Sequence, residues 1–345
     1  MLILGIETSC DETAAAVVKD GREVLSNVVA SQIDIHQAYG GVVPEVAARS
    51  HIEIILPVIH EALETTNVSW DDIDGIAVTQ GPGLLGSLLI GTLTARTLAL
   101  THNKPLYAVN HVVAHTFANF LIEPQPKFPL LSLSVSGNHS HLLLFEAPLK
   151  YRLLGSARDD AAGEAFDKVA RMLGLPYPGG PKISQLALEG DEQAFKLPIA
   201  RLDNPYDFSF SGLKTAVLRA LQHAADADFR LHSSKLPDRL TDQQKANMAA
   251  SFQRVACETL AGHLKQAAIE FKPKTVVIAG GVAANTRLRE EVSHQLTYPM
   301  NYAPIQYCTD NGAMIAAMGY HLAQAGCTTN PHELSTNPNL PISRA

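Results

Sequence analysis

The sequence predicts an α/β protein built from two related domains. At 345 residues the chain is long for a single hydrophobic core. Apolar residues make up 46% of it and charged residues 18%, a composition typical of folded globular domains. Two segments, 2–18 and 130–145, share one pattern, in which two short apolar runs flank a polar turn. We therefore expect each segment to open one of two domains of common design.

Each of these openings predicts a β-hairpin. In the first, the runs "LILGIE" (2–7) and "AAAVV" (14–18) are joined by the turn "TSCDET". In the second, "LLSLSV" and "HLLLF" flank the turn "SGNHS". The small residues of the second turn allow the backbone to curl around an anion. The first turn adds two carboxylates, Asp11 and Glu12, which either handle protons at a site or are ordinary solvated turn residues.

Hydrophobic periodicity predicts the remaining elements. Before the second hairpin it indicates a helix over 44–66, a strand over 75–80 and a helix after the turn "GPGLLGS". Later it indicates helices near 160–174, 180–189 and 244–271, the strand "TVVIAGG" and a helix after "VAAN". Residues 222–245 are polar and contain Pro237, which indicates a loop or an insertion. An Asn- and Pro-rich tail ends the chain.

The composition argues against several classes of protein. No uninterrupted apolar run reaches the roughly 20 residues that a membrane helix needs. The first residues, "MLILGIETSC", lack the basic segment of a signal peptide, so we expect a cytoplasmic protein with no membrane partner. The net charge of −7 argues against a broad basic surface, so a nucleic acid would be held by a local patch or by companion subunits. The scattered cysteines are expected to be reduced thiols: Cys10, Cys257, Cys308 and Cys327.

The segment "NHVVAH" places His111 and His115 four residues apart at the expected start of a helix. Residues at this spacing share a helix face, so both imidazoles can reach one metal ion. With 14 histidines in the chain, the spacing alone does not separate a metal site from ordinary helix histidines. A zinc protease is not indicated, because the residue after His111 is Val112 and not the glutamate that activates water.

A third candidate ligand, Asp310, stands in "CTDNGAMIAA" directly before an apolar run. Thr309, Asp310 or Asn311 can equally be the N-cap of the helix that this run forms. Two histidines and one carboxylate are a recognised set for a first-row transition metal that keeps open positions for substrate.

Glycine-rich turns suggest where a nucleotide can approach the backbone. In "VVIAGGVAANTRL" a strand ends in Gly-Gly before a helix, which suits phosphate binding but is also an ordinary strand-to-helix turn. "GPGLLGS" is a weaker case, and neither contains the P-loop or the dinucleotide-binding fingerprint. In "DDAAGEAFDKVARMLGLPYPGGP", Glu164, Asp167 and Lys168 either bind ribose hydroxyls or form an exposed helix face.

Taken together, the motifs resemble the tRNA N6-adenosine threonylcarbamoyltransferase family, of the TsaD (Gcp) type. They occur in that family's order from residue 4 to about 317. The motifs are "GIETSCDET", "YGGVVPEVAARSH", "GPGLLGSLLIG", "NHVVAH", "VSGNH", "DDAAGEAFDKVARMLGLPYPGGP", "FSFSGLKT", "AGGVAANTRLR" and "CTDNGAMIA".

The resemblance implies an actin/Hsp70-like (ASKHA) fold of two related domains with a ligand cleft between them. We expect residues 1–105 to form the first domain, 106–320 the second, with the metal and donor site, and 321–345 a tail that packs on the first. The implied reaction moves a threonylcarbamoyl group from threonylcarbamoyl-AMP to N6 of the adenosine beside the anticodon of tRNAs that read ANN codons. A TsaB-like paralogue and a TsaE-like ATPase are the implied protein partners.

The resemblance also implies roles for individual residues. His111, His115 and Asp310 are expected to bind one divalent ion, Fe²⁺ or Zn²⁺. The expected donor contacts are Ser134, Val135, Ser136, Gly137 and Asn138. The nucleotide part is assigned to Asp167, Gly180 and Asn285, with Ser184 as a further contact. Asp11 and Glu12 are assigned to the reacting end, as catalytic base or orienting groups.

Two features depart from the family pattern. The family usually has VSGGH where this chain has "VSGNH", and residues 222–245 are longer than expected. Asn138 therefore adds a side chain inside the donor turn, where it either changes the φ preference or contributes a hydrogen bond. The alternatives from other classes are a non-catalytic TsaB-like scaffold and a nucleotide-dependent small-molecule carbamoyltransferase or hydrolase. A scaffold has no need of the His111, His115 and Asp310 set.

Overall fold

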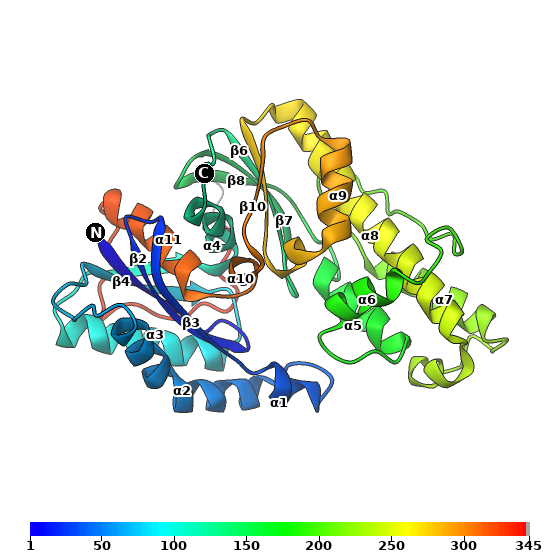
Figure 1. The fold of residues 1–345 in the computed structure, drawn as a ribbon, viewed down its shortest axis with the longest axis horizontal. Helices are drawn as coiled ribbons and strands as arrows, with labels where there is room; N and C mark the ends of the chain where they lie inside the picture. Colours follow the sequence, from blue (N-terminus) through cyan, green and yellow to red (C-terminus); the bar gives the residue numbers. More distant parts are fainter. Residues whose placement is uncertain (343–345) are drawn as a thin grey trace.

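The computed structural model describes residues 1–342 and contains two five-stranded sheets that lie side by side (Figure 1). In the first sheet the strand order is β3-β2-β1-β4-β5. Its strands are β1 (Leu2–Glu7), β2 (Glu12–Lys19), β3 (Glu23–Ser31), β4 (Gly75–Gly81) and β5 (Leu106–Asn110). β1 and β2 form the expected antiparallel hairpin, whereas β4 and β5 add in parallel.

The second sheet repeats this design, with the order β8-β7-β6-β9-β10. Its strands are β6 (Leu130–Val135), β7 (Ser140–Ala147), β8 (Lys150–Ser156), β9 (Thr275–Ala279) and β10 (Met300–Tyr302). β6, β7 and β8 are antiparallel, β9 adds in parallel to β6 and β10 in parallel to β9, as β4 and β5 do in the first sheet. The prediction that two similar hairpins open two related α/β domains is therefore confirmed.

Helices cover the sheets and connect them. In the first half these are α1 (Ile33–Gln37), α2 (Pro44–Glu64), α3 (Leu85–Thr101), α4 (His111–Phe117) and the short η1 (Ala118–Leu121). In the second half they are α5 (Ala162–Met172), α6 (Gly179–Ala187), α7 (Ser211–Ala224), η2 (Ser233–Lys235), η3 (Pro237–Arg239), α8 (Asp242–Phe271), η4 (Gly281–Ala284), α9 (Thr286–Gln295), α10 (Ile305–Cys308) and α11 (Gly312–Gln324). No helix within residues 1–342 is both long and apolar enough to cross a bilayer.

Strands β1 and β2 are buried on both faces of the first sheet, which explains why both are continuous apolar runs rather than alternating ones. Leu4 and Ile6 of β1 belong to the core formed with α2 and α3. Ile3 points to the other face and joins the larger core that extends into the second domain. Both "LILGIE" and "AAAVV" are therefore apolar because each side chain meets packed protein.

Helix α11 lies very close to β1 because small residues face each other there. A Cβ atom added to Gly5 would lie 2.2 Å from the carbonyl oxygen of Gly312, so only glycine permits this approach. α11 also packs against β2, β4 and α4. The residues just before Gly312 are consequently held at the end of the first sheet.

The domain boundaries expected from the sequence, after residues 105 and 320, do not coincide with the segments that pack together in each sheet. β5 (Leu106–Asn110) is an edge strand of the first sheet, and α11 (Gly312–Gln324) packs on that sheet (Figure 1). The start and the end of the expected second domain therefore lie with the first, because parallel pairing to β4 and the close contact at Gly5 outweigh chain order.

The tail lies against the first domain over its described residues. Thr329 pairs with Leu106, the Asn337 N–H donates to the Gln80 carbonyl, and Leu334 is buried in the core with α2 and α3. Residues 343–345 of the expected tail lie outside the described residues.

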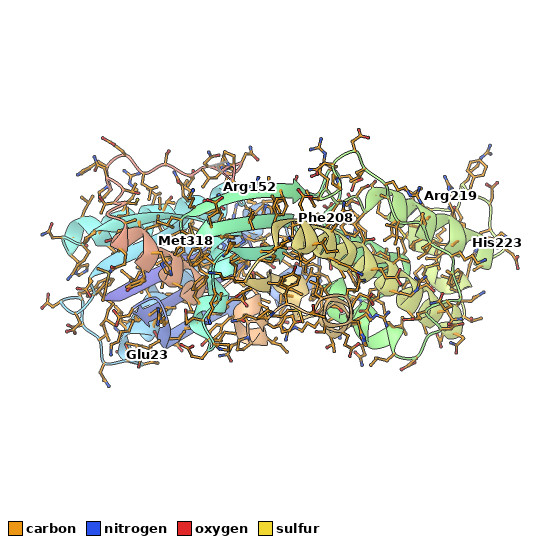
Figure 2. The ribbon with its side chains drawn as sticks, turned by 90° about the horizontal axis from the view of Figure 1, so that it is seen from above. Glu23, Arg152, Phe208, Arg219, His223 and Met318 are labelled. Atoms are coloured by element: carbon orange, nitrogen blue, oxygen red, sulfur yellow. The ribbon has the colours of Figure 1, made fainter. Side chains whose placement is uncertain are left out.

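The insertion around 222–245 is only partly irregular. Helix α7 runs to Ala224 and α8 begins at Asp242, where Thr241 and Gln244 form a capping box. The residues between contain only the short turns η2 and η3. Seen from above, α7 with Arg219 and His223 lies at the end of an elongated molecule, far from Glu23 of the first sheet (Figure 2).

The His321 side chain on α11 packs against α4 and η1 and makes the stability of the fold depend on pH. Its ring lies 5.1 Å from that of Phe117 and 5.5 Å from that of Phe120. Burial lowers the pKa of His321 from 6.5 to about 4. Between these values the unfolded chain binds the proton and the folded chain does not, so the free energy of unfolding falls as the pH decreases.

We expect His321→Phe to reduce the fall in melting temperature between pH 6.5 and pH 4, because the packing remains and the titrating group is removed. Thermal melts followed by circular dichroism at several pH values test this. His60→Phe, on the exposed face of α2, is the matched control. An unchanged pH dependence in His321→Phe contradicts the assignment.

Candidate functional site

The two histidines of "NHVVAH" lie on α4, which follows β5 directly: His111 is its first residue and His115 lies in its last turn. Asn110 caps this helix, since its Oδ1 accepts a hydrogen bond from the Val113 N–H at 3.2 Å. His111 and His115 are 4% and 1% exposed, and their ring centroids are 4.7 Å apart. The i, i+4 spacing therefore places both rings on one side of a buried helix, as predicted.

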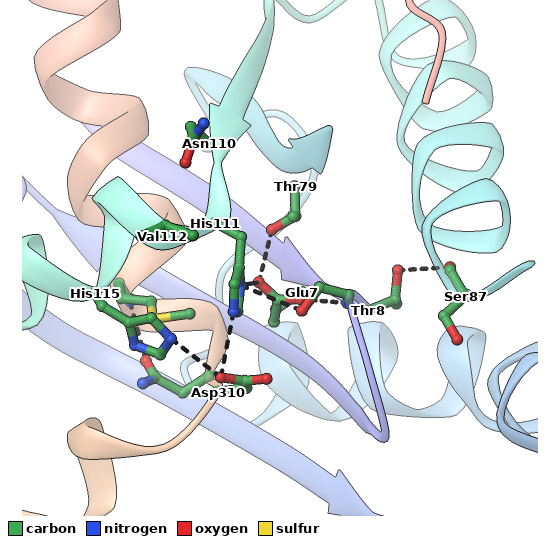
Figure 3. A network of polar contacts seen from close by, with 12 residues as sticks. Glu7, Thr8, Thr79, Ser87, Asn110, His111, Val112, His115 and Asp310 are labelled. Atoms are coloured by element: carbon green, nitrogen blue, oxygen red, sulfur yellow. Dashed lines mark hydrogen bonds and ion pairs between the residues drawn. The ribbon is translucent and has the colours of Figure 1, made fainter. Parts of the chain in front are cut away.

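Asp310 faces the histidines because its neighbour takes the capping role. The Oδ1 atom of Asn311 accepts from the Met314 N–H at 3.0 Å and caps α11. Asp310 Oδ1 lies 3.6 Å from His111 Nε2 and 3.3 Å from His115 Nε2 (Figure 3). One donor atom from each of the three residues lies within 4.8 Å of the other two, close enough to share one metal ion.

A second carboxylate, that of Glu7, contacts the His111 ring at Nδ1, the nitrogen that does not face Asp310. Glu7, at the end of β1, is fully buried, and its Oε2 lies 2.9 Å from His111 Nδ1. Thr79 donates to the same Oε2 at 2.6 Å (Figure 3). The Ser9 N–H donates to Oε1. A carboxylate on Nδ1 keeps that nitrogen protonated and turns Nε2 toward Asp310, an arrangement typical of metal-binding histidines.

The electrostatics of this cluster favour a cation. Burial lowers the pKa of His111, but the charges of Glu7 and Asp310 outweigh it and raise that pKa to about 9. Burial raises the pKa of Asp310, but the charge of His111 and the contact with His115 bring it well below its usual range. Neither ring nitrogen of His115 makes a hydrogen bond within the described part of the chain, despite the close approach to Asp310. A divalent ion would satisfy all three groups, so the residues fit a metal site.

The acidic turn of the first hairpin lies in the same electrostatic environment. Asp11 is 6% exposed, so it is not an ordinary solvated turn residue. Burial raises the pKa of Glu12 well above its usual range, and the charges of Asp310 and Asp11 add to the effect. The Cys10 carbonyl in this turn accepts from His51 Nε2 at 3.0 Å and from Ser87 Oγ at 3.1 Å, which fixes the turn.

Residues 134–138, the end of β6 and the start of the second hairpin turn, contact both α4, which carries the two histidines, and α5. Ser134 Oγ donates to the carbonyl oxygen of Val112, between the two histidines of α4, at 3.4 Å. On the other side, the Ser136 and Gly137 carbonyls accept from the Gly163 and Glu164 N–H groups at the start of α5, at 3.2 and 2.8 Å. The turn is thus held from both sides.

Asn138, which replaces the glycine usual in the family, has no strained backbone. Asn138 is exposed and is not among the residues with positive φ, and neither is Gly137. Any contribution of Asn138 therefore comes from its side chain and not from a left-handed turn.

Three of the four residues assigned to the nucleotide line one cavity of about 810 Å³ in the second domain. Gly180 and Ser184 come from α6, and Asn285 caps α9. The fourth residue, Asp167 on α5, does not line it but accepts from the Gly179 N–H at 2.7 Å, next to Gly180. Burial raises the pKa of Asp167.

Three further residues at these sites are absent from the sequence-based assignment. Glu7 could have been found from the sequence, because it is a carboxylate at the end of an otherwise apolar strand. Gln253 lies in the middle of α8 and reaches the cavity through its side chain, which no local pattern indicates. His139 follows the 134–138 turn, 6.2 Å from the His111 ring, and burial together with the charges of nearby histidines lowers its pKa to about 3.

Comparison with known proteins agrees with the motifs. Residues 23–317 match the family described as TsaD: tRNA N6-adenosine threonylcarbamoyltransferase. A curated protein of that name from Symbiobacterium thermophilum is 52% identical over 339 residues, covering 97% of this chain and 95% of the relative. One from Thermomicrobium roseum is 49% identical over 357 residues, covering 99% of this chain and 97% of the relative.

Solved structures of low sequence identity share the fold. HypF from T. kodakarensis superposes with a TM-score of 0.62 at 15% identity, covering 96% of this chain and 49% of that one. Component A of (R)-2-hydroxyglutaryl-CoA dehydratase from Acidaminococcus fermentans gives 0.52 at 19% identity, covering 94% and 99%. A ROK hexokinase from Thermus thermophilus gives 0.50 at 18%, covering 94% and 100%. The expected actin-like ASKHA fold is confirmed.

We expect Glu7→Gln to weaken divalent metal binding by about 10- to 100-fold, because the amide no longer fixes the His111 ring as a carboxylate does. Chelator competition with Zn²⁺ and Fe²⁺ measures this. Glu53→Gln, exposed on α2, is the control. Equal metal affinity in Glu7→Gln and the control would remove Glu7 from the site.

Proposed function

The chain belongs to the tRNA N6-adenosine threonylcarbamoyltransferase family, and we propose that threonylcarbamoyl-AMP is its donor and the adenosine 3′ of the anticodon in ANN-reading tRNAs its acceptor. It is a transferase, and tRNA is its substrate. The observation that carries the proposal is the buried His111, His115 and Asp310 cluster beside the 134–138 turn.

The proposed reaction exchanges one bond at the carbamoyl carbon. The N6 amine of adenosine attacks that carbon, the bond to the phosphate oxygen breaks, and AMP leaves with the electron pair. The nitrogen loses one proton to a base. A divalent ion in the cluster, Fe²⁺ or alternatively Zn²⁺, would polarise the carbonyl oxygen and hold the donor, since two imidazoles and one carboxylate leave open coordination positions.

The chain's own residues bind and orient the reactants. The backbone of the turn from Ser134 to Asn138, held rigidly between α4 and α5, would hold the donor. Gly180, Ser184 and Asn285 in the cavity, with Asp167 beside them, would hold the nucleotide part.

The acidic turn of the first domain would serve the acceptor. Asp11 is the proposed base that receives the proton from N6, and Glu12 its orienting partner. Burial, together with the charges of Asp310 and Asp11, raises the pKa of Glu12 well above its usual range, which supports a hydrogen-bonding role for that carboxyl.

A scaffold role is less well supported than catalysis. A protein that acts only by dimerising has no use for a buried His-His-Asp cluster whose histidine is fixed by a second carboxylate. A tRNA-independent hydrolase or small-molecule carbamoyltransferase would need the same cluster, so it is tested by the dependence on tRNA.

We propose a TsaB-like paralogue as partner on the surface formed by α2 and α3, with a TsaE-like ATPase acting on the complex in the cytoplasm. Large apolar side chains are exposed there, among them Leu56 at 61% and Leu93 at 45%. They line a groove of about 340 Å³ between the two helices. An apolar groove between two long helices suits helices presented by a protein of the same fold.

The transfer of labelled threonine from threonylcarbamoyl-AMP to unmodified ANN-decoding tRNA tests the activity, with the partner subunits present. We expect wild type to label the tRNA, and His111→Ala and Asp310→Ala to lower the rate by roughly 100-fold or more, because each removes a metal ligand. Asp11→Ala is expected to lower the rate while metal content stays unchanged.

Wild-type protein that consumes the donor equally well without tRNA would replace the proposal with a hydrolase. Full transfer by Asp11→Ala would end its assignment as base. Transfer at the wild-type rate by both metal-ligand variants would separate the cluster from the reaction.

We expect Leu93→Glu to weaken the complex with the TsaB-like partner at least roughly tenfold, because a charge would be buried in an apolar contact. Analytical ultracentrifugation of the two subunits measures this. Ile269→Glu, an exposed apolar residue on α8, is the control. Equal association of both variants places the partner elsewhere.

A further inference from the structure

Three side chains from separate elements meet in the cavity of the second domain. Ser184 comes from α6, Gln253 from α8, and Asn285 from the start of α9, and all three line the cavity. Asn285 Nδ2 donates to Ser184 Oγ at 3.1 Å and to Gln253 Oε1 at 2.9 Å. Ser184 Oγ donates to the same Oε1 at 2.7 Å.

The orientation of both amides follows from one helix cap. Asn285 Oδ1 accepts from the Leu288 N–H at 3.1 Å, so its Nδ2 must be the atom that faces Ser184 and Gln253. Because Nδ2 is a donor, the Gln253 atom that it meets must be Oε1. The orientation of the Gln253 amide is therefore fixed, with its Nε2 group on the side opposite Ser184 and Asn285.

That Nε2 group has two N–H bonds and no acceptor within residues 1–342. Gln253 is only 8% exposed, and it lines the cavity. A ligand in the cavity that brings an acceptor would therefore form a hydrogen bond with this donor. Gln253 Nε2 is thus a fixed donor at the cavity, and no residue among 1–342 supplies its acceptor.

The surrounding walls suit a flat aromatic ring. Phe166, Val282 and Ile305 line the same cavity and offer apolar surface. Gly180 and Gly281 also line it, and a Cβ at either would meet no atom within 4 Å, so the backbone is open to close approach. Small-molecule sites typically combine such apolar walls with a few fixed polar groups.

We infer that Gln253 is a base-recognition residue, whose Nε2 donates a hydrogen bond to a ring nitrogen of the adenine in the donor nucleotide. The inference rests on the proposed function, because the adenylate is the proposed donor. Ser184 and Asn285 act on the base through Gln253, since both hold its Oε1 and so aim its Nε2. Adenine suits this arrangement because N1, N3 and N7 are all acceptors.

Binding of AMP to the metal-loaded full chain, measured by isothermal titration calorimetry, tests this without the transfer reaction. Gln253→Glu keeps an oxygen for Ser184 and Asn285 but places a second acceptor against the ring nitrogen. We expect it to raise the Kd for AMP at least roughly tenfold. Gln266→Glu, exposed on the same helix, adds the same charge and is expected to bind AMP as wild type does.

Ligand atoms identify the contact. We compare 1-deaza-, 3-deaza- and 7-deaza-AMP, each of which lacks one ring acceptor, in wild type and in Gln253→Leu. For wild type, one of the three should bind about tenfold more weakly than AMP, and in Gln253→Leu that penalty should vanish. Because each comparison is made within one variant, a general loss of stability in Gln253→Leu does not produce the expected pattern.

Two results overturn the inference. The first is an unchanged Kd for AMP in Gln253→Glu and Gln253→Leu. The second is a set of deaza penalties that is the same in wild type and in Gln253→Leu. Either result leaves the adenylate donor in place, because AMP still binds. Absence of AMP binding to wild type overturns both the inference and the proposed donor.

Discussion

The site depends on the buried contact between Glu7 and His111. Glu7 ends the central strand of the first sheet, and His111 begins the helix that leads toward the second domain. Their side chains are 0% and 5% exposed, and the contact of 2.9 Å joins two parts of the chain 104 residues apart. Breaking a buried pair of this kind by removing one partner costs about 3–5 kcal/mol, so the hairpin, α4 and the orientation of His111 are maintained together.

The third member of the cluster reaches the same point by packing. Gly5 and Gly312 allow α11 to approach β1 so closely that the residues before the helix lie at the end of the sheet. Asn311 then caps the helix, which leaves the Asp310 carboxylate available to His111 and His115. The close contact of Gly5 with Gly312 therefore sets the position of Asp310. Because Asn311 caps the helix, the Asp310 carboxylate is free to face the histidines.

The two domains supply different parts of the proposed chemistry. The first contributes the acidic turn, Glu7 and the support for α11, while the second contributes the 134–138 turn and the cavity with its polar floor. The turn touches both, because Ser134 contacts α4 and the Ser136 carbonyl contacts α5. We propose that such an arrangement would hold the donor along its length, with one end at the His111, His115 and Asp310 cluster and the nucleotide end in the cavity.

The sequence by itself determined the local structure. Apolar runs with turn composition predicted both hairpins, and helical periodicity predicted most helices, since these patterns depend on residues close along the chain. The His111 and His115 pair was also readable, because a helix period places i and i+4 on one face. The edge strands β3 and β8 and the helix α7 were not predicted, since their patterns are mixed with polar residues.

Only the tertiary structure decided which of the candidate residues meet. The sequence left Asp310 as a cap or a ligand; in the structure Asn311 is the cap, and the Asp310 carboxylate faces His111 and His115. It did not indicate that residues 106–110 and α11 lie with the first sheet, because strand pairing and close glycine contacts join residues far apart in the chain. The position of Gln253 in the cavity could not be predicted from the sequence for the same reason. Its function follows from hydrogen bonds to α6 and α9, and no pattern within α8 records them.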